Sequence, residues 1–330
     1  MSTSKNGEVV LDFLKATFKG DRVRRSELLA KDAVFWTAGD LPMSGHHSAE
    51  ESNAGAGKFF ASLATPFTMN IGEITEEGEF VCFEAESHAV LTDGRAYNNQ
   101  YHMMYQVRDG LIVMHKEYLD TLHFQEMFFP DASLEPSAQV RKTNLTAVTA
   151  QLAGPFVKQA AATSSSAVAD PTASEGPTPN DNKEIVLRYL QASMTGDDAT
   201  VQSALAADAR FWTPGDMSIS GYVTPEKLYA DARAMFETIS SPFVLNIGQV
   251  TAAEDRVCVE VESTASLSGS RQYNNQYHML FKLRDGRIVL QKEYFDTFHV
   301  YKLFRHTPQV GGPRIERASN IERISHTLST

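Results

Sequence analysis

The residues best suited to chemistry are acidic side chains in two nearly identical segments, KEYLDTLH and KEYFDTFH. A carboxylate buried in an apolar pocket has a pKa raised toward neutrality, so it can accept and release a proton without a cofactor. The candidate catalytic residues are Asp120 and Asp296, which we favour, and Glu117 and Glu293. The two acids of each segment are three positions apart, so on a regular strand only one of them can enter a pocket. The alternative is that they form salt bridges with the neighbouring lysines.

A second group of candidates lies in the segment YNNQYHM, which occurs unchanged at 97–103 and 273–279. Alternate residues of a strand share a face, so each copy places two phenols and an amide together. These substrate-binding candidates are Tyr97, Asn99, Tyr101, Tyr273, Asn275 and Tyr277. Such groups could orient a substrate oxygen and donate to a developing enolate. The alternative is an ordinary sheet core with satisfied hydroxyls.

Other polar and aromatic residues have plainer interpretations. Trp36 and Trp212, the only tryptophans, are expected in the core or the pocket wall, and as substrate-binding candidates they could stack on a ligand. For His102 and His278, on the opposite strand face, we expect a subunit interface, with a general base as the alternative. The glutamates at 84, 86, 260 and 262 share a face that we expect to be solvated or to meet a subunit.

Several kinds of site are excluded by their missing motifs. No HxH or HExxH spacing gathers metal ligands, so no metal site is predicted. No GxSxG elbow occurs, and the two cysteines, Cys82 and Cys258, lie inside hydrophobic segments. Nothing matches a phosphate loop or a dinucleotide fingerprint, so no cofactor is predicted.

Behind these motifs is an internal repeat of 176 residues. FWTAGD at 35–40 returns as FWTPGD at 211–216, and PFTMNIG at 66–72 returns as PFVLNIG at 242–248. From 6 to 128, roughly 45% of positions match their counterparts without a gap. A repeat of this length is a whole domain, since solenoid periods are shorter. We place a first domain at 1–130, an Ala-, Ser-, Pro- and Thr-rich linker at 131–180, a second domain at 181–305 and a C-terminal arm at 306–330.

Composition narrows the class of protein further. The chain has 330 residues, of which 30 are basic and 41 acidic, giving a net charge of −11. No basic face suits nucleic acid, and no apolar run of ~18–20 residues could span a bilayer. The N-terminus lacks the order of a signal peptide, and two unpaired cysteines fit a reducing compartment. We therefore expect a soluble cytoplasmic protein with neither nucleic-acid nor membrane partners.

Each repeat shows helical patterns first and strand patterns afterwards. In the first repeat, apolar spacing predicts helices over 8–18, 24–30 and 48–63. Alternation predicts strands over 67–74, 80–91, 97–108 and 111–124, with Asp109 and Gly110 in a hairpin turn. Helices followed by an antiparallel sheet indicate an α+β fold in which the helices cover one face.

The motif order FW-T-x-G-D, Y-x-N-x-Y-x-M, R-D-G-x-I-V and K-E-Y-x-D-T, found twice, resembles the SnoaL-like polyketide cyclase group. That group belongs to the nuclear transport factor 2-like superfamily, which also includes ketosteroid isomerase, scytalone dehydratase and limonene epoxide hydrolase. The resemblance implies two cone-shaped α+β barrels in tandem, with an acidic side chain late in each domain serving as acid or base. It also implies that the sheets pair, either within the chain or in a homodimer.

The sequence thus predicts a cofactor-independent acid–base enzyme of cyclase, isomerase or dehydratase type. Its partner would be a small, largely apolar carbonyl or polyketide-like substrate. The first alternative is a non-catalytic ligand-binding or protein-interaction module. A further enzyme alternative is an epoxide hydrolase, although glutamates align where that reaction's arginine and one of its acids would lie. Both repeats keep the same polar set, so we expect neither to be merely structural.

Overall fold

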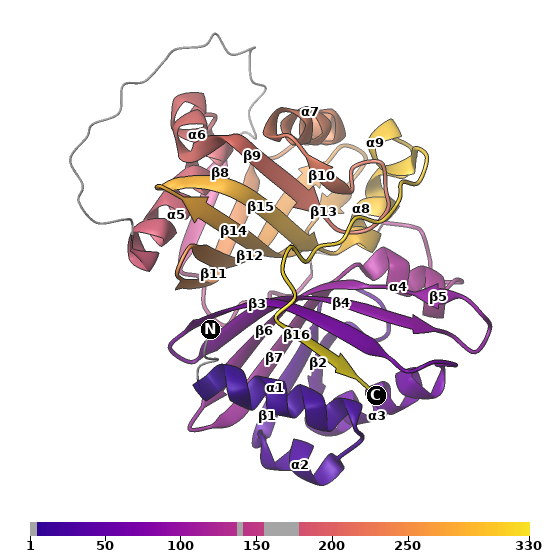
Figure 1. Ribbon diagram of the computed structural model, residues 1–330. Coiled ribbons are helices and arrows are strands. Elements are labelled where there is room, and N and C mark those ends of the chain that lie inside the picture. The colour runs from indigo at the N-terminus through magenta and orange to yellow at the C-terminus, as the bar shows by residue number, and fades with distance from the viewer. Residues whose placement is uncertain (1–4, 137–140, 155–177) are drawn as a thin grey trace.

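The computed structural model describes residues 5–136, 141–154 and 178–330 and contains two α+β halves (Figure 1). The middle of the predicted linker, 155–177, lies outside the described residues. The first half consists of α1 (Lys5–Phe18), α2 (Arg22–Glu27), β1 (Leu29–Thr37), β2 (Gly45–Ser48), α3 (Ala49–Ala61), β3 (Thr68–Glu77), β4 (Phe80–Val90), β5 (Ala96–Tyr97), β6 (Gln100–Arg108), β7 (Leu111–Leu119) and α4 (Thr121–Phe128).

The second half repeats this order. It consists of α5 (Pro179–Thr195), α6 (Asp198–Ala204), β9 (Leu205–Thr213), β10 (Gly221–Val223), α7 (Pro225–Met235), the 3-10 turn η1 (Phe236–Thr238), β11 (Phe243–Ala253), β12 (Arg256–Leu267), β13 (Arg271–Tyr273), β14 (Gln276–Arg284), β15 (Arg287–Phe295) and α8 (Thr297–Phe304). The segments after the halves add β8 (Ala150–Gly154), and α9 (Pro308–Gly311) with β16 (His326–Ser329).

Local sequence signals account for the ends of these elements. Ser48 and Thr224 cap α3 and α7 by accepting backbone N–H bonds from Glu51 and Lys227. The predicted Asp109–Gly110 turn has φ values of 52° and 77°, which a hairpin turn of this kind requires. Gly196 ends α5 with φ 74°, a conformation in which glycine has no steric cost.

Each half forms a sheet whose one face is covered by helices. The strand orders are β16-β3-β4-β6-β7-β1-β2 and β10-β9-β15-β14-β12-β11-β8. Pairing is antiparallel except between β1 and β7 and between β9 and β15. Two separate clusters of buried apolar residues fill the space between helices and sheet, one in each half. The fold is therefore the predicted α+β architecture, present twice.

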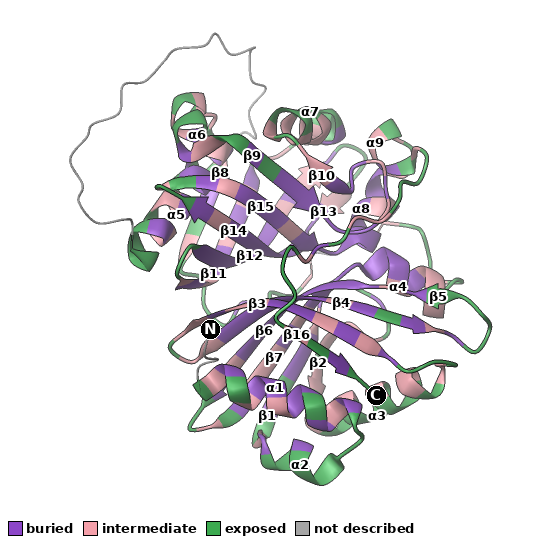
Figure 2. Ribbon diagram, viewed as in Figure 1, coloured by how far each residue is buried: buried purple, intermediate pink, exposed green. Residues whose placement is uncertain are grey.

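The other faces of the two sheets meet, and their strands are buried there (Figure 2). Lys292 Nζ contacts Glu84 Oε1 at 2.8 Å, and Lys116 makes the equivalent ion pair with Glu260. Between the sheets, the His102 and His278 rings stack with centroids 4.0 Å apart. The two histidines, Glu84 and Glu260 thus face the other repeat, which is one of the two outcomes expected for the glutamate face.

Each half also lends a strand to the other. β8, from the predicted linker, pairs with β11 of the second sheet, while β16, from the predicted arm, pairs with β3 of the first. Figure 1 shows β16 and the C-terminus lying beside α1 and β3 of the first half. Leu152 and Leu328 join the cores of the halves they reach. These segments are therefore integral parts of the two domains.

The last predicted strand, 111–124, is shorter than expected. β7 ends at Leu119, and Asp120 begins α4 by accepting the His123 N–H at 3.2 Å. The same change occurs at Asp296, which caps α8. A short aspartate side chain that accepts backbone N–H groups favours a helix start over a continuing strand.

Candidate functional site

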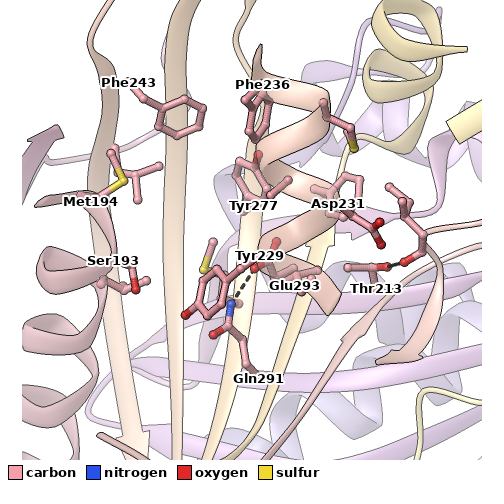
Figure 3. A pocket seen from close by; sticks show the side chains of 18 of the residues that line it. Ser193, Met194, Thr213, Tyr229, Asp231, Phe236, Phe243, Tyr277, Gln291 and Glu293 are labelled. Atoms are coloured by element: carbon pink, nitrogen blue, oxygen red, sulfur yellow. Dashed lines mark hydrogen bonds between the residues drawn. The ribbon is translucent and has the colours of Figure 1, made fainter. Parts of the chain in front are cut away.

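The second half contains a cavity of about 160 Å³ between α5, α7 and the helix-covered face of its sheet (Figure 3). Its volume is close to that of a protein cavity known to hold one benzene ring. Most of its wall is apolar, formed by Leu190, Met194, Ile219, Leu228, Ala232, Met235, Phe236, Phe243, Leu245, Met279, Phe295 and Val300. The polar wall groups come from Tyr189, Ser193, Thr213, Tyr229, Asp231, Tyr273, Tyr277, Gln291 and Glu293.

Glu293 is the predicted catalytic candidate that reaches this cavity. On β15, Gln291, Glu293 and Phe295 line the cavity, whereas Lys292 takes part in the contact between the halves. Burial raises the pKa of Glu293 to about 7, although a hydrogen bond from Gln291 favours the ionised form. The Gln291 Nε2 donates to Glu293 Oε1 at 2.6 Å. A carboxyl with this pKa can exist in both protonation states at neutral pH.

A chain of hydrogen bonds ties Glu293 to the helices. Gln291 Oε1 accepts from the Tyr189 hydroxyl of α5 at 2.8 Å, and that hydroxyl lies 2.7 Å from the Tyr229 hydroxyl of α7. Figure 3 shows Tyr229, Gln291 and Glu293 together at the cavity wall. Because Gln291 uses its oxygen toward Tyr189, its NH₂ group is directed at the carboxylate. The sequence reasoning missed these three partners because it followed positions that match between repeats, and all three differ.

Tyr273 and Tyr277 add two phenols to the same wall. Their hydroxyls are hydrogen-bonded to each other, and burial raises the pKa of both. Both therefore stay protonated at neutral pH, and while one hydroxyl donates to the other, the second hydroxyl can donate to a ligand oxygen. Asn275 does not line the cavity; its Nδ2 donates to the Asp296 carbonyl at 3.3 Å and so fixes the start of α8.

Asp120 and Asp296, the favoured candidates, lie between the halves and outside the cavity wall. Arg141 contacts Asp296 at 2.5 Å, and Arg317 contacts Asp120 at 2.6 Å. Burial would raise the pKa of Asp296, but Arg141 and His299 outweigh it, and the pKa falls to about 2. Both aspartates also accept a hydroxyl bond from a threonine of the other half. The structure thus gives them helix-capping and ion-pairing contacts.

The tryptophans also lie between the halves. Trp36 and Trp212 form a buried cluster with Tyr118 and Tyr294, on the faces of the sheets opposite the helices. The ring centroids of Trp212 and Tyr294 are 5.0 Å apart. Both tryptophans thus lie in a buried core, as expected first for them, and neither lines the cavity described above.

In the first half, Glu117 is the counterpart of Glu293 and has different surroundings. Burial raises the pKa of Glu117 to about 7, and no side chain in the described residues forms a hydrogen bond with it. Tyr97 and Tyr101 join their hydroxyls at 2.8 Å, and Asn99 donates to the Asp120 carbonyl at 3.2 Å. The two tyrosines and the asparagine are thus arranged as in the second half.

The apolar wall, however, is bulkier in the first half. Phe18 and Phe59 stand where the second half has methionines, and Phe124 replaces Val300. Phe59 packs its ring 5.4 Å from Phe67 and 5.3 Å from Tyr97. Aromatic side chains of the first half therefore pack where the second half has the smaller side chains of its cavity wall.

Two kinds of feature are absent from the described residues. They contain no group of three or more His, Cys, Asp or Glu side chains arranged to hold a metal ion. No helix among them is long and apolar enough to cross a membrane.

Comparisons with known proteins agree with the repeat. The family model described as SnoaL-like domain matches residues 10–115 and 186–291. No curated protein matches the chain.

Several solved structures resemble a single repeat. IdmH of Streptomyces antibioticus shares 21% identity, with 37% of this chain and 97% of that chain covered and a TM-score of 0.33. An NTF2-like protein of Burkholderia xenovorans shares 22% identity, with coverages of 38% and 97% and a TM-score of 0.33. TerC, co-crystallised with polyporic acid, shares 19% identity, with coverages of 37% and 97% and a TM-score of 0.32.

Proposed function

Because the chain belongs to the SnoaL-like domain family, we propose that it is a cofactor-independent acid–base enzyme whose reaction takes place in the cavity of the second half. The observation that carries the proposal is Glu293, a carboxyl of pKa about 7 on the wall of an apolar cavity. The substrate would be a small, largely apolar carbonyl compound of about the size of one ring.

The wall supplies the two groups that such a reaction needs. The Glu293 carboxylate would take a proton from the carbon next to the carbonyl, and the same carboxyl would return it to another atom of the substrate. One hydroxyl of the Tyr273–Tyr277 pair would donate to the oxygen on which negative charge develops, while the other donates to its partner. Loss of water from an apolar cavity strengthens both interactions. Isomerisation, cyclisation and dehydration all begin with this step.

The choice of Glu293 over Asp296 rests on surroundings. A carboxylate held by an arginine at a pKa near 2 is a weak base at neutral pH, whereas a carboxyl of pKa near 7 matches the operating pH. The aromatic packing around Glu117 supports a non-catalytic role for the first half.

Exchange of α-protons tests the proposal without knowledge of the natural substrate. The full chain is incubated in D₂O with cyclopentanone, cyclohexanone or cyclohex-2-enone, and deuterium uptake is followed by NMR. We expect uptake above the buffer rate for at least one ketone, and a 10²- to 10⁴-fold loss in Glu293→Gln. The matched control, Glu117→Gln, should keep the wild-type rate. Equal rates for wild type and Glu293→Gln, or a wild-type rate no higher than buffer, would refute the assignment.

A further inference from the structure

Arg25 is a buried cation for which the described residues supply no anionic partner. It lies on α2 of the first half with 5% of its surface exposed. Its Nε and Nη1 atoms are buried, and no acceptor in residues 5–136, 141–154 and 178–330 lies within hydrogen-bond reach of them. The guanidinium instead lies 5.0 Å from the Phe13 ring and 5.6 Å from the Phe35 ring. Ring faces attract a cation but do not accept its in-plane N–H groups.

Two further donors lie beside the same phenylalanine rings. Tyr105 packs against Phe13 and His115 against Phe35, and the Tyr105 and His115 rings stack with centroids 4.3 Å apart. Among the described residues, His115 Nε2 is buried without a hydrogen-bond partner, and the Tyr105 hydroxyl has a weak contact of 3.8 Å to the Met103 sulfur. Burial and the nearby Arg25 lower the pKa of His115 to about 3, so at neutral pH its ring is uncharged and can donate from one nitrogen. The guanidinium of Arg25, the imidazole of His115 and the phenol of Tyr105 therefore lie close together, and none of them has an oxygen acceptor among the described residues.

The second half shows that the fold does not need this arrangement. The counterparts of Arg25, Tyr105 and His115, 176 residues later, are Val201, Phe281 and Gln291. Val201 and Phe281 are buried among apolar residues, and Gln291 is fully engaged by Tyr189 and Glu293. All three donors are therefore particular to the first half. Burial of an unpaired charge is costly, and the second half shows that the fold forms without it.

The covering helix is also slimmer in the first half. Ser52, Asn53 and Gly55 of α3 stand where α7 places Leu228, Tyr229 and Asp231 at the cavity wall. No residue of α3 is buried, whereas Met235 of α7 is. The first half thus has bulkier aromatic rings on one side and smaller side chains on the side of α3.

We propose that the first half binds a small organic carboxylate, and that Arg25, Tyr105 and His115 hold its carboxylate group. Three donors without an acceptor suit an anion, because each would then satisfy a group that is otherwise buried unpaired. The phenylalanine rings around Arg25 suit an apolar body on that anion. Inorganic phosphate suits the place less well, since its second charge and further oxygens would be buried without partners. This site is separate from the proposed reaction centre and does not depend on it.

Calorimetric titration of the full chain with acetate, propanoate and benzoate tests the proposal, with benzamide as the uncharged counterpart of benzoate. We expect wild type to bind at least one carboxylate and to bind benzamide at least 10-fold more weakly. Arg25→Val, Tyr105→Phe and His115→Gln combined introduce the side chains of the second half, which the fold accommodates there. This triple variant should fold and bind the carboxylate at least 10-fold more weakly.

A control variant shows whether the affinity comes from these three donors. Arg22→Met removes an exposed arginine of the same helix and should leave the affinity unchanged. Equal affinity in wild type and triple variant would overturn the proposal. So would a wild-type chain that binds none of the carboxylates, or that binds phosphate as tightly as carboxylates. Arg25 would then act only through its contacts with the two phenylalanine rings.

Discussion

At the scale of single residues, Glu117 and Glu293 show how much of an acid's behaviour comes from its neighbours. Both occupy the same strand position, and burial raises the pKa of both to about 7. Only Glu293 has a hydrogen-bond partner in the described residues that fixes its carboxylate, and only Glu293 lines the described cavity. Because Gln291 in turn is held by Tyr189 of α5, whose hydroxyl contacts that of Tyr229 on α7, the orientation of the acid depends on two helices as well as on its own strand.

The pKa of Glu293 predicts the pH dependence of α-proton exchange. A general base acts in its ionised form, so the rate should rise with pH and level off above about 7. Gln291→Leu removes a hydrogen bond that favours the carboxylate, so it should move the midpoint to higher pH. Exchange rates measured by NMR from pH 5 to 9 give both midpoints. An unchanged midpoint in Gln291→Leu would contradict the role given to the amide.

For substitution of Asp296 we predict a loss of stability without loss of the catalytic base. Asp296→Asn keeps a helix-capping side chain but breaks the 2.5 Å ion pair with Arg141, whose contact with Asp40 is 3.7 Å long, so it should lower the free energy of unfolding by about 3 kcal/mol. Urea denaturation at pH 7 measures this, and Asp197→Asn, at an exposed helix cap, should change it by less than about 0.5 kcal/mol.

The sign of the pH effect gives a second check on Asp296. Its pKa falls from 3.8 to about 2 on folding, so its contribution is complete above pH 3.8 and disappears as pH falls through 2. The difference between wild type and Asp296→Asn should therefore shrink over that range. Loss of α-proton exchange in a folded Asp296→Asn would return the catalytic role to the aspartate.

At the scale of elements, the exchanged strands β8 and β16 mean that each half includes a strand from the segment that follows the other half. Both occupy equivalent edges, with Leu152 and Leu328 at the same repeat position. Upstream of them, Asn144 accepts from Lys116 and donates to Glu262, while Asn320 accepts from Lys292 and donates to Glu86. The 176-residue repeat thus continues in structure to the end of the chain, although few residues match there.

Deletion of 325–330 tests the contribution of β16. It removes the backbone partner of β3 from Thr68 to Ile71 and takes Leu328 from the first core. We expect faster amide exchange in β3, and unchanged exchange in β11, which keeps β8 as its partner. Hydrogen–deuterium exchange with mass spectrometry resolves the two strands. Equal acceleration in both would mean that the halves respond as one unit.

At the scale of the molecule, the two halves share one buried polar interface but differ inside. The contacts between them repeat about an approximate two-fold relation: Lys116 with Glu260 and Lys292 with Glu84, Asp120 with Thr297 and Asp296 with Thr121. The interiors do not repeat, since one has a cavity beside Glu293 and the other a packed aromatic cluster and the three donors around Arg25. Duplication within one chain allows each interior to change alone, which two copies of one chain cannot do.

The interface predicts that the covalent link is dispensable after folding. A chain with a protease site inserted at 165 and cleaved there should keep the elution volume of the intact chain in size-exclusion chromatography. Strand exchange and the buried ion pairs hold the halves together without the link. Separation into two species of about half the mass at micromolar concentration would show that the interface is weak.

The sequence by itself determined the duplication, the α+β order of elements, and the set of acids and phenols from which the site is drawn. These features depend on local spacing and on identity between repeats, which the chain displays directly. The sequence around Asp120 also favours a helix cap, because aspartate is common directly before a helix. The alternating pattern of 111–124 nevertheless led us to predict a continuous strand there.

Only the tertiary structure decided which acid meets a cavity and which meets an arginine. Arg141 and Arg317 reach the aspartates from segments that, by composition, look like a linker and an arm, and Tyr189, Tyr229 and Gln291 differ from their counterparts in the first half. A pKa depends on burial and on charges brought close from distant parts of the chain. For that reason the sequence identified the strand position of Glu117 and Glu293 as a candidate, while the residues packed around each glutamate determine its chemistry.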